Sequence, residues 1–150
     1  MTGTQGSPEA VGLDPAIYNS FVADLELVGI EFLKVHGERV VVGVAAHTRF
    51  DLTATYQRDD RVIYYRYEAT SHFVDDNNVV LGNVMASIQV VVRSKMTPSE
   101  SCIEQFGATS GSLMAHPYLR EAIASTAQRL DFLGVLLPMM KQHLAEPDEN

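Results

Sequence analysis

The sequence predicts an α+β domain in which a four-stranded antiparallel sheet is followed by C-terminal helices that pack on it. Two observations support this fold class. Four segments between residues 24 and 92 have strand-like patterns and are separated by polar stretches. After residue 96 the apolar residues recur at helical spacing instead. Strands that come first and helices that follow are typical of α+β domains.

The first two predicted strands differ in how they are patterned. Residues 24–36 carry apolar side chains at positions of both parities, so we expect a strand that is covered on both faces. Residues 49–57 alternate, and their apolar positions share one face, which indicates a half-exposed strand. Those positions are Phe50, Leu52, Ala54 and Tyr56.

Two further strands follow at short intervals. Asp59 and Asp60 provide a turn into residues 61–74, and the polar cluster of residues 75–78 provides another into residues 79–92. The third and fourth strands also alternate, so each has one apolar face. Because strands with short loops between them usually pair with their sequence neighbours, the pattern predicts an antiparallel meander.

The helical part begins near Thr97, where Thr97-Pro98-Ser99-Glu100 has the pattern of a capping box. Gly107 stands where a left-handed residue would end a short helix. After a linker at residues 108–111, a longer helix runs to about Leu130, with Pro117 kinking it or starting it. Its apolar stripe consists of Leu119, Ala122, Ile123, Thr126, Ala127 and Leu130.

We interpret the chain as one domain with short appendages. Residues 1–15 are rich in Gly, Pro, Ser and Thr and predict a mobile arm, residues 16–145 form the domain, and residues 146–150 form an acidic tail. Within the domain, residues 132–140 are strongly apolar but interrupted by Gly134 and Pro138. This segment either caps the sheet or binds a partner, and composition alone favours the cap.

Composition excludes several classes of function. The formal net charge of −8 has the wrong sign for binding nucleic acid. No apolar run is long enough to cross a membrane, and the N-terminus does not have the pattern of a signal peptide. Cys102 is the single cysteine, which fits a reducing, cytoplasmic setting and leaves no thiol framework for zinc.

The sequence offers little support for catalysis, a metal or a cofactor. The five histidines do not have paired ligand spacing, and the segment Gly107–Ser112 has glycines but not the lysine of a phosphate-binding loop. Ser112 and Cys102 have no nucleophile motif around them. We therefore expect neither catalytic residues nor a bound cofactor or metal. An alternative stays open, in which Tyr64, Tyr65 and Tyr67 line the pocket of a small-ligand-binding or enzymatic module.

The helix segment from His116 onwards resembles the SecB family of export chaperones. The resemblance is carried by His116-Pro117-Tyr118-Leu119-Arg120-Glu121, by the following residues to Phe132, and by Leu137-Pro138. His116 departs from the family pattern, which has an aromatic residue there. The order of sheet and helices also fits, so the resemblance covers roughly residues 24–140.

The resemblance implies a chaperone that holds unfolded polypeptides without ATP, for protein export or for a dedicated client such as an antitoxin. It implies a homo-oligomer of four copies. It also implies contact with the export motor SecA through Glu31, Val74 and Asp76. Apart from the resemblance, we expect a structural or assembly role for Tyr118 and Arg120, because they flank a helix start where ring packing and guanidinium hydrogen bonds can fix the helix. The residues that the resemblance implies for client binding are Phe132, Leu133, Val135, Leu136, Leu137, Met139 and Met140.

Overall fold

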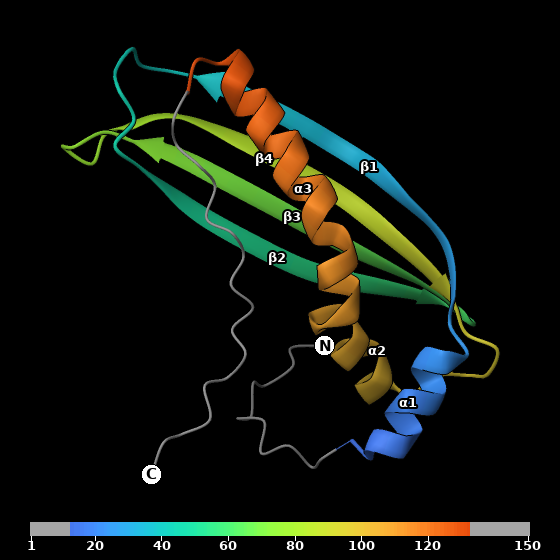
Figure 1. Ribbon diagram of the computed structural model, residues 1–150. Coiled ribbons are helices and arrows are strands. Elements are labelled where there is room, and N and C mark those ends of the chain that lie inside the picture. Colours follow the sequence, from blue (N-terminus) through green and yellow to red (C-terminus); the bar gives the residue numbers. More distant parts are fainter. Residues whose placement is uncertain (1–12, 133–150) are drawn as a thin grey trace, which may run out of the picture.

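The computed structural model describes residues 13–132, and these form one sheet with three helices (Figure 1). The four strands and the two C-terminal helices appear in the predicted order. The elements are α1 (Pro15–Ala23), β1 (Glu26–Arg39), β2 (His47–Asp59), β3 (Val62–Val74), β4 (Val80–Arg93), α2 (Glu100–Ala108) and α3 (Ser110–Arg129).

The sheet is antiparallel throughout, but it is not a simple meander. Its strand order is β1-β4-β3-β2, so β1 pairs with β4 at one edge while β2 forms the other edge. The predicted meander is therefore correct for β2, β3 and β4 and wrong for β1. Residues 40–46 are long enough to cross the ends of the two central strands, a distance of about three strand spacings of ~4.8 Å each.

Polar side chains make the two tight turns, as the sequence predicts. Asp60 between β2 and β3 has a φ of 53°, a conformation that Asp tolerates better than most residues. Between β3 and β4, Asp75 Oδ1 accepts hydrogen bonds from the backbone N–H groups of Asn77 and Val79, both at 2.9 Å. Asn78 follows with a φ of 62°. These turns fix the register of the three-stranded meander.

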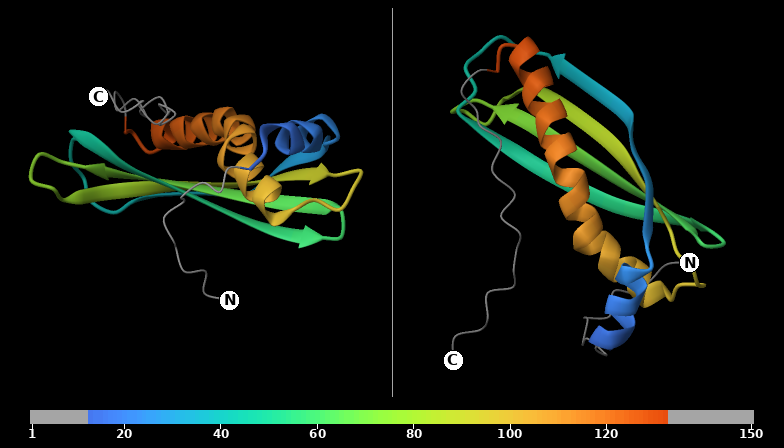
Figure 2. Two further views of the ribbon diagram at one scale, coloured as in Figure 1. Left: turned by 90° about the horizontal axis from the view of Figure 1, so that it is seen from below. Right: turned by 45° about the vertical axis from the view of Figure 1, so that its right-hand side comes forward.

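All three helices lie on one face of the sheet (Figure 2). The core lies between the sheet and α3, and the predicted stripe of α3 faces it, with Leu119, Ala122, Ile123 and Ala127 buried. Opposite them, β3 and β4 contribute an alternating set of buried residues. The set includes Ile63, Tyr65, Tyr67, Ala69, Phe73, Val84, Ala86, Ile88, Val90 and Val92. Pro117 lies inside α3, because the helix begins at Ser110, seven residues before the proline.

Helix α2 starts two residues later than the capping-box interpretation predicts. Ser99, not Thr97, is the N-cap, and its hydroxyl accepts a hydrogen bond from the N–H of Cys102 at 3.3 Å. Gly107 is not a C-cap but lies within the helix, against the ring of Tyr65. The hydroxyls of Tyr65 and Tyr67 donate to the carbonyls of Ile103 and Gly107, both at 2.7 Å. Two buried tyrosines thus hold α2 to β3.

Helix α1 was not predicted. Asp14 and Pro15 are its cap and first residue, with Asp14 Oδ1 accepting from the N–H of Ala16 at 2.9 Å. The helix is anchored by Phe21, which is buried edge-to-face against Phe106 of α2 at 6.3 Å between ring centroids. Helix α1 therefore begins at Pro15, the last residue of the expected arm.

Candidate functional site

The exposed apolar side chains of the described residues are concentrated in one stretch of the chain. Of fourteen large apolar residues that are exposed, nine fall between residues 27 and 44, in β1 and the loop that follows it. Scattered exposed apolar residues are normal in soluble proteins, but a contiguous group marks an interaction site. These nine are Leu27, Val28, Phe32, Leu33, Val35, Val40, Val41, Val42 and Val44. Together with Tyr118 they are here named the β1–loop surface.

Strand β1 was expected to be covered on both faces, and in the single chain it is not. It is an edge strand, and its pairing with β4 shifts at Val28 and Leu33, where one residue is inserted each time. Such bulges turn extra side chains outward and interrupt the regular edge. The inserted valine and leucine are about half exposed. Because of these two insertions, Leu27, Phe32 and Val35 pair with core-facing residues of β4, whereas Glu31, Lys34 and His36 lie on the opposite face. The prediction of a strand covered on both faces is therefore wrong for the single chain.

On the helix face, an aromatic pair connects the middle of β1 with α3. Phe32 and Tyr118 meet edge-to-face at 6.4 Å between ring centroids, and they are 48% and 45% exposed. Arg120, one turn away from His116, is exposed and makes no hydrogen bond or ion pair with any described residue. Burial and, secondly, the charge of Arg120 lower the pKa of His116 below its ordinary value.

The loop from Val40 to Ala46 is attached at its base but presents its valines to solvent. The N–H groups of Val40 and Val41 donate to the carbonyl of Leu81 at 2.8 and 3.1 Å. The side chains of Val42 and Val44 are nevertheless 91% and 86% exposed. Sequence reasoning missed these residues, although the run Val40-Val41-Val42-Gly43-Val44 falls between two predicted strands and was a visible signal.

Arg39 fixes the position of this loop relative to α3. Its guanidinium donates to the carbonyl of Leu130 at 2.6 Å and to that of Gly43 at 2.8 Å. The same group lies 4.7 Å from the centroid of the Phe132 ring. One side chain thus connects the end of β1, the loop and the end of α3, which makes the base of the loop rigid.

The comparisons with known proteins found a match in structure but not in sequence. No protein-family model matches the chain, and no curated protein matches it. A solved structure that does match is that of the Mycobacterium tuberculosis Rv1957 SecB-like chaperone in complex with a ChAD peptide from the Rv1956 HigA1 antitoxin. The match has a TM-score of 0.74 at 13% identity and covers 88% of this chain and 99% of that one.

The chain has a SecB-like fold. This confirms the fold that the resemblance implied, with helices following a four-stranded antiparallel sheet. It also places the β1–loop surface in a fold that another protein uses as a chaperone. None of the helices within residues 13–132 is both long and apolar enough to cross a membrane. In the same residues, no three His, Cys, Asp or Glu side chains are grouped as a metal ion would require.

Of the predicted client-binding residues, only Phe132 lies among the described residues of this SecB-like fold. A Schellman motif ends α3 just before this residue. Asp131 has a φ of 61°, its N–H donates to the carbonyl of Gln128, and the N–H of Phe132 donates to the carbonyl of Ala127. The motif turns the Phe132 ring onto the sheet, where it stacks on Phe73 at 4.3 Å and is 4% exposed. The side chain is therefore part of the core in the single chain.

The other predicted client-binding residues lie outside the described part of the structure. They are Leu133, Val135, Leu136, Leu137, Met139 and Met140. Their assignment stays a prediction.

The three residues expected to contact an export motor do not lie together. Glu31 is exposed and pairs with Gln89, on the sheet face opposite the described helices. Val74 has a buried side chain and pairs with Val80. Val80 lies nine residues along β4 from Gln89, which is a distance of roughly 30 Å. Asp76 is exposed in the next turn. A contact through all three would have to extend along most of the sheet.

The tyrosine cluster does not form the pocket that the alternative interpretation requires. Tyr65 and Tyr67 point toward α2, and burial raises the pKa of both phenols. Tyr64 pairs with Val91 and lies on the opposite face. Tyr56 donates to Glu100, and this hydrogen bond raises the pKa of Tyr56 to about 12. Tyr56, Tyr65 and Tyr67 thus join β2 and β3 to α2.

Proposed function

We propose that the protein is a holdase chaperone that binds unfolded polypeptides without ATP. The observation that carries this proposal is the β1–loop surface, an exposed apolar region on a SecB-like fold. An edge strand offers free backbone groups to an extended client chain, and neighbouring apolar side chains can contact every second side chain of that client. Because burial of one large apolar side chain is worth roughly 1.5–3 kcal/mol, a few such contacts offset the cost of ordering a client.

Two kinds of client fit this proposal, proteins destined for export and a single dedicated client such as an antitoxin. The solved SecB-like chaperone that matches this fold holds a peptide from an antitoxin, which supports the second kind. The resemblance supports the first, with SecA as a partner at Glu31, Val74 and Asp76. We place the protein in the cytoplasm as an assembly of four copies, with Tyr118 contributing through its contact with Phe32 and Arg120 beside it.

The segment that follows Phe132 belongs to the same proposal. We propose that Leu133, Val135, Leu136, Leu137, Met139 and Met140 also bind clients through their apolar side chains. Leu136 and Met140 are the most useful to change, since each lies two residues after Gly134 or Pro138, residue types that disfavour helices and strands.

Suppression of aggregation tests the proposal. A chemically denatured client is diluted into buffer with the parent protein or with Val42→Ser/Val44→Ser, and light scattering is followed over time. We expect the parent to keep the client soluble at a near-stoichiometric ratio without nucleotide, and the variant to require about tenfold more protein. A Leu136→Ser/Met140→Ser variant tests the C-terminal segment in the same assay.

The matched control is Thr53→Ser/Thr55→Ser. Both positions are exposed and lie on the face of β2 that points away from the helices. It should act as the parent does. If the parent fails to suppress aggregation of several unrelated clients and of antitoxin-derived peptides, the proposed function is wrong. If only the Leu136 and Met140 variant is unimpaired, those two residues do not bind clients.

A further inference from the structure

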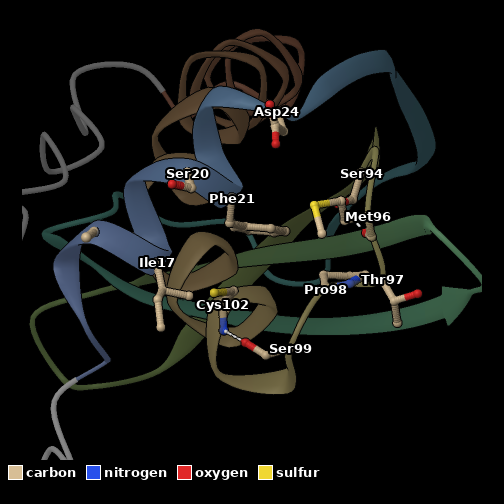
Figure 3. Close-up of a pocket in the computed structure, with 11 residues that line it drawn as sticks. Ile17, Ser20, Phe21, Asp24, Ser94, Met96, Thr97, Pro98, Ser99 and Cys102 are labelled. Carbon is tan, nitrogen blue, oxygen red and sulfur yellow. Dashed lines mark hydrogen bonds between the residues drawn. The ribbon is translucent and has the colours of Figure 1, made fainter.

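A second apolar site lies at the opposite end of β1 from the loop of residues 40–46, here named the valine loop. It is a pocket of about 460 Å³ between α1, the segment that joins β4 to α2, and the first turn of α2 (Figure 3). Neither the sequence analysis nor the resemblance points to it. Its walls are mainly apolar, and they are formed by Ala16, Ile17, Phe21, Met96, Pro98 and Cys102.

The size and walls of the pocket fit a side chain and not a whole folded partner. A volume of this order accommodates a group of small-ligand size. Phe21 and Cys102 are buried in the wall, whereas Ile17 and Met96 are exposed at the opening. Methionine adapts its shape to different apolar partners. The pocket therefore suits one large apolar side chain that enters from outside.

Asp24 gives the pocket a charge preference. It is half-buried at the C-terminal end of α1 and among the residues that line the pocket (Figure 3). Its carboxylate makes no hydrogen bond or ion pair with any described residue. The negative end of the α1 dipole adds to its charge. A carboxylate that is partly desolvated and unpaired attracts a cation more strongly than an exposed one.

Two hydroxyls of the pocket are also without a described partner. Ser94 Oγ donates to the carbonyl of Met96 and Ser99 caps α2, so both are used within the chain. Ser20 and Thr97 line the same pocket, and their hydroxyls hydrogen-bond to no described residue. They can therefore serve the backbone of an incoming extended segment.

The geometry points to a subsite for an extended polypeptide segment in which a large apolar residue is followed or preceded by Lys or Arg. The apolar side chain enters the pocket, and the basic side chain faces Asp24. This inference rests on the proposed function, which it deepens. Strand β1 has 14 residues and is roughly 45 Å long, so a client of about that many residues could contact the valine loop at one end and this pocket at the other.

The test measures binding of two short fluorescent peptides by anisotropy. Both are Gly/Ser-rich and contain one leucine, which is next to arginine in one peptide and next to glutamate in the other. We expect the Leu–Arg peptide to bind about fivefold or more tightly than the Leu–Glu peptide. Asp24→Asn, which keeps the shape of the side chain, should remove that preference.

A second pair of variants locates the site. Ser20→Phe places a ring at the pocket and should weaken binding of the Leu–Arg peptide at least tenfold. Asn19→Phe changes the neighbouring exposed position of α1, which does not line the pocket, and should leave that binding unchanged. Equal binding of both peptides, an unaffected Asp24→Asn variant, or equal effects of the two phenylalanines would overturn the inference. The proposed function would survive these results if Val42→Ser/Val44→Ser still impaired suppression of aggregation.

Discussion

Arg39 shows how much a single side chain can organise in this fold. It bonds to the carbonyls of Leu130 and Gly43 and lies over the ring of Phe132. We predict that Arg39→Ala lowers the free energy of unfolding by about 2–3 kcal/mol, because charged hydrogen bonds are lost and two carbonyls lose their donors. Urea denaturation measures the change. Arg49→Ala, on the opposite sheet face, should change it by less than ~0.5 kcal/mol.

His116 gives the fold a dependence on pH with a definite sign. Because burial and Arg120 lower its pKa, the unfolded chain takes up the proton first as the pH falls. The stability contributed by the neutral imidazole is complete above pH ~6.5 and declines as the pH drops through that value. Urea denaturation at pH 7.5 and 5.5 should show that the free energy of unfolding falls less between these two pH values for His116→Gln than for the parent. An unchanged loss would contradict this assignment, and His47→Gln is the exposed control.

Single residues also mark where sequence reasoning reached its limit. Asp14 and Pro15 carry ordinary signals for a helix start, yet α1 is stabilised by Phe21 against Phe106, a contact between residues far apart in the chain. Asp131 occupies a left-handed position that usually belongs to Gly or Asn, so the turn that buries Phe132 had no clear signal. Both depend on packing that local patterns do not contain.

At the scale of the element, the fit between α2 and β3 is close enough to test with one methyl group. A Cβ on Gly107 would lie 2.7 Å from Tyr65 Cε1, and the Tyr65 hydroxyl is tied to Ile103. We therefore predict that Gly107→Ala destabilises the protein by about 1–3 kcal/mol, although alanine favours helices by ~1 kcal/mol. Thermal denaturation measures this. Gly29→Ala, with open space around its Cβ, should be tolerated, and a stabilised Gly107→Ala would refute the close contact.

The elements themselves were largely predictable, and their arrangement was not. Alternation located β2, β3 and β4 to within a few residues, because each has one face on the core. The pairing of β1 with β4 depends on where residues 40–46 lead the chain, and periodicity does not encode that. The apolar pattern of β1 was recognised, but a strand covered on both faces was expected, and the two bulges were not. The valine loop was passed over because it has no period.

At the scale of the whole molecule, the exposed edge predicts self-association. Strand β1 leaves about half-exposed apolar side chains and unpaired backbone groups along its edge, which isolated proteins normally protect. We predict a homo-oligomer at micromolar concentration, measured by light scattering coupled to gel filtration. Val28→Lys/Leu33→Lys should shift it to smaller species, because two charges at the bulges oppose strand pairing. A parent protein that is monomeric at these concentrations would contradict this prediction.

The most direct test of the central claim is equilibrium binding of a permanently unfolded polypeptide, such as a reduced and carboxymethylated protein, by titration calorimetry at several temperatures. If the β1–loop surface holds clients, the parent binds with a negative change in heat capacity, because apolar surface is buried. Val42→Ser/Val44→Ser, whose side chains are exposed and not needed for folding, then binds at least tenfold more weakly. Absence of binding by the parent, or equal affinity and heat-capacity change for parent and variant, would contradict the claim.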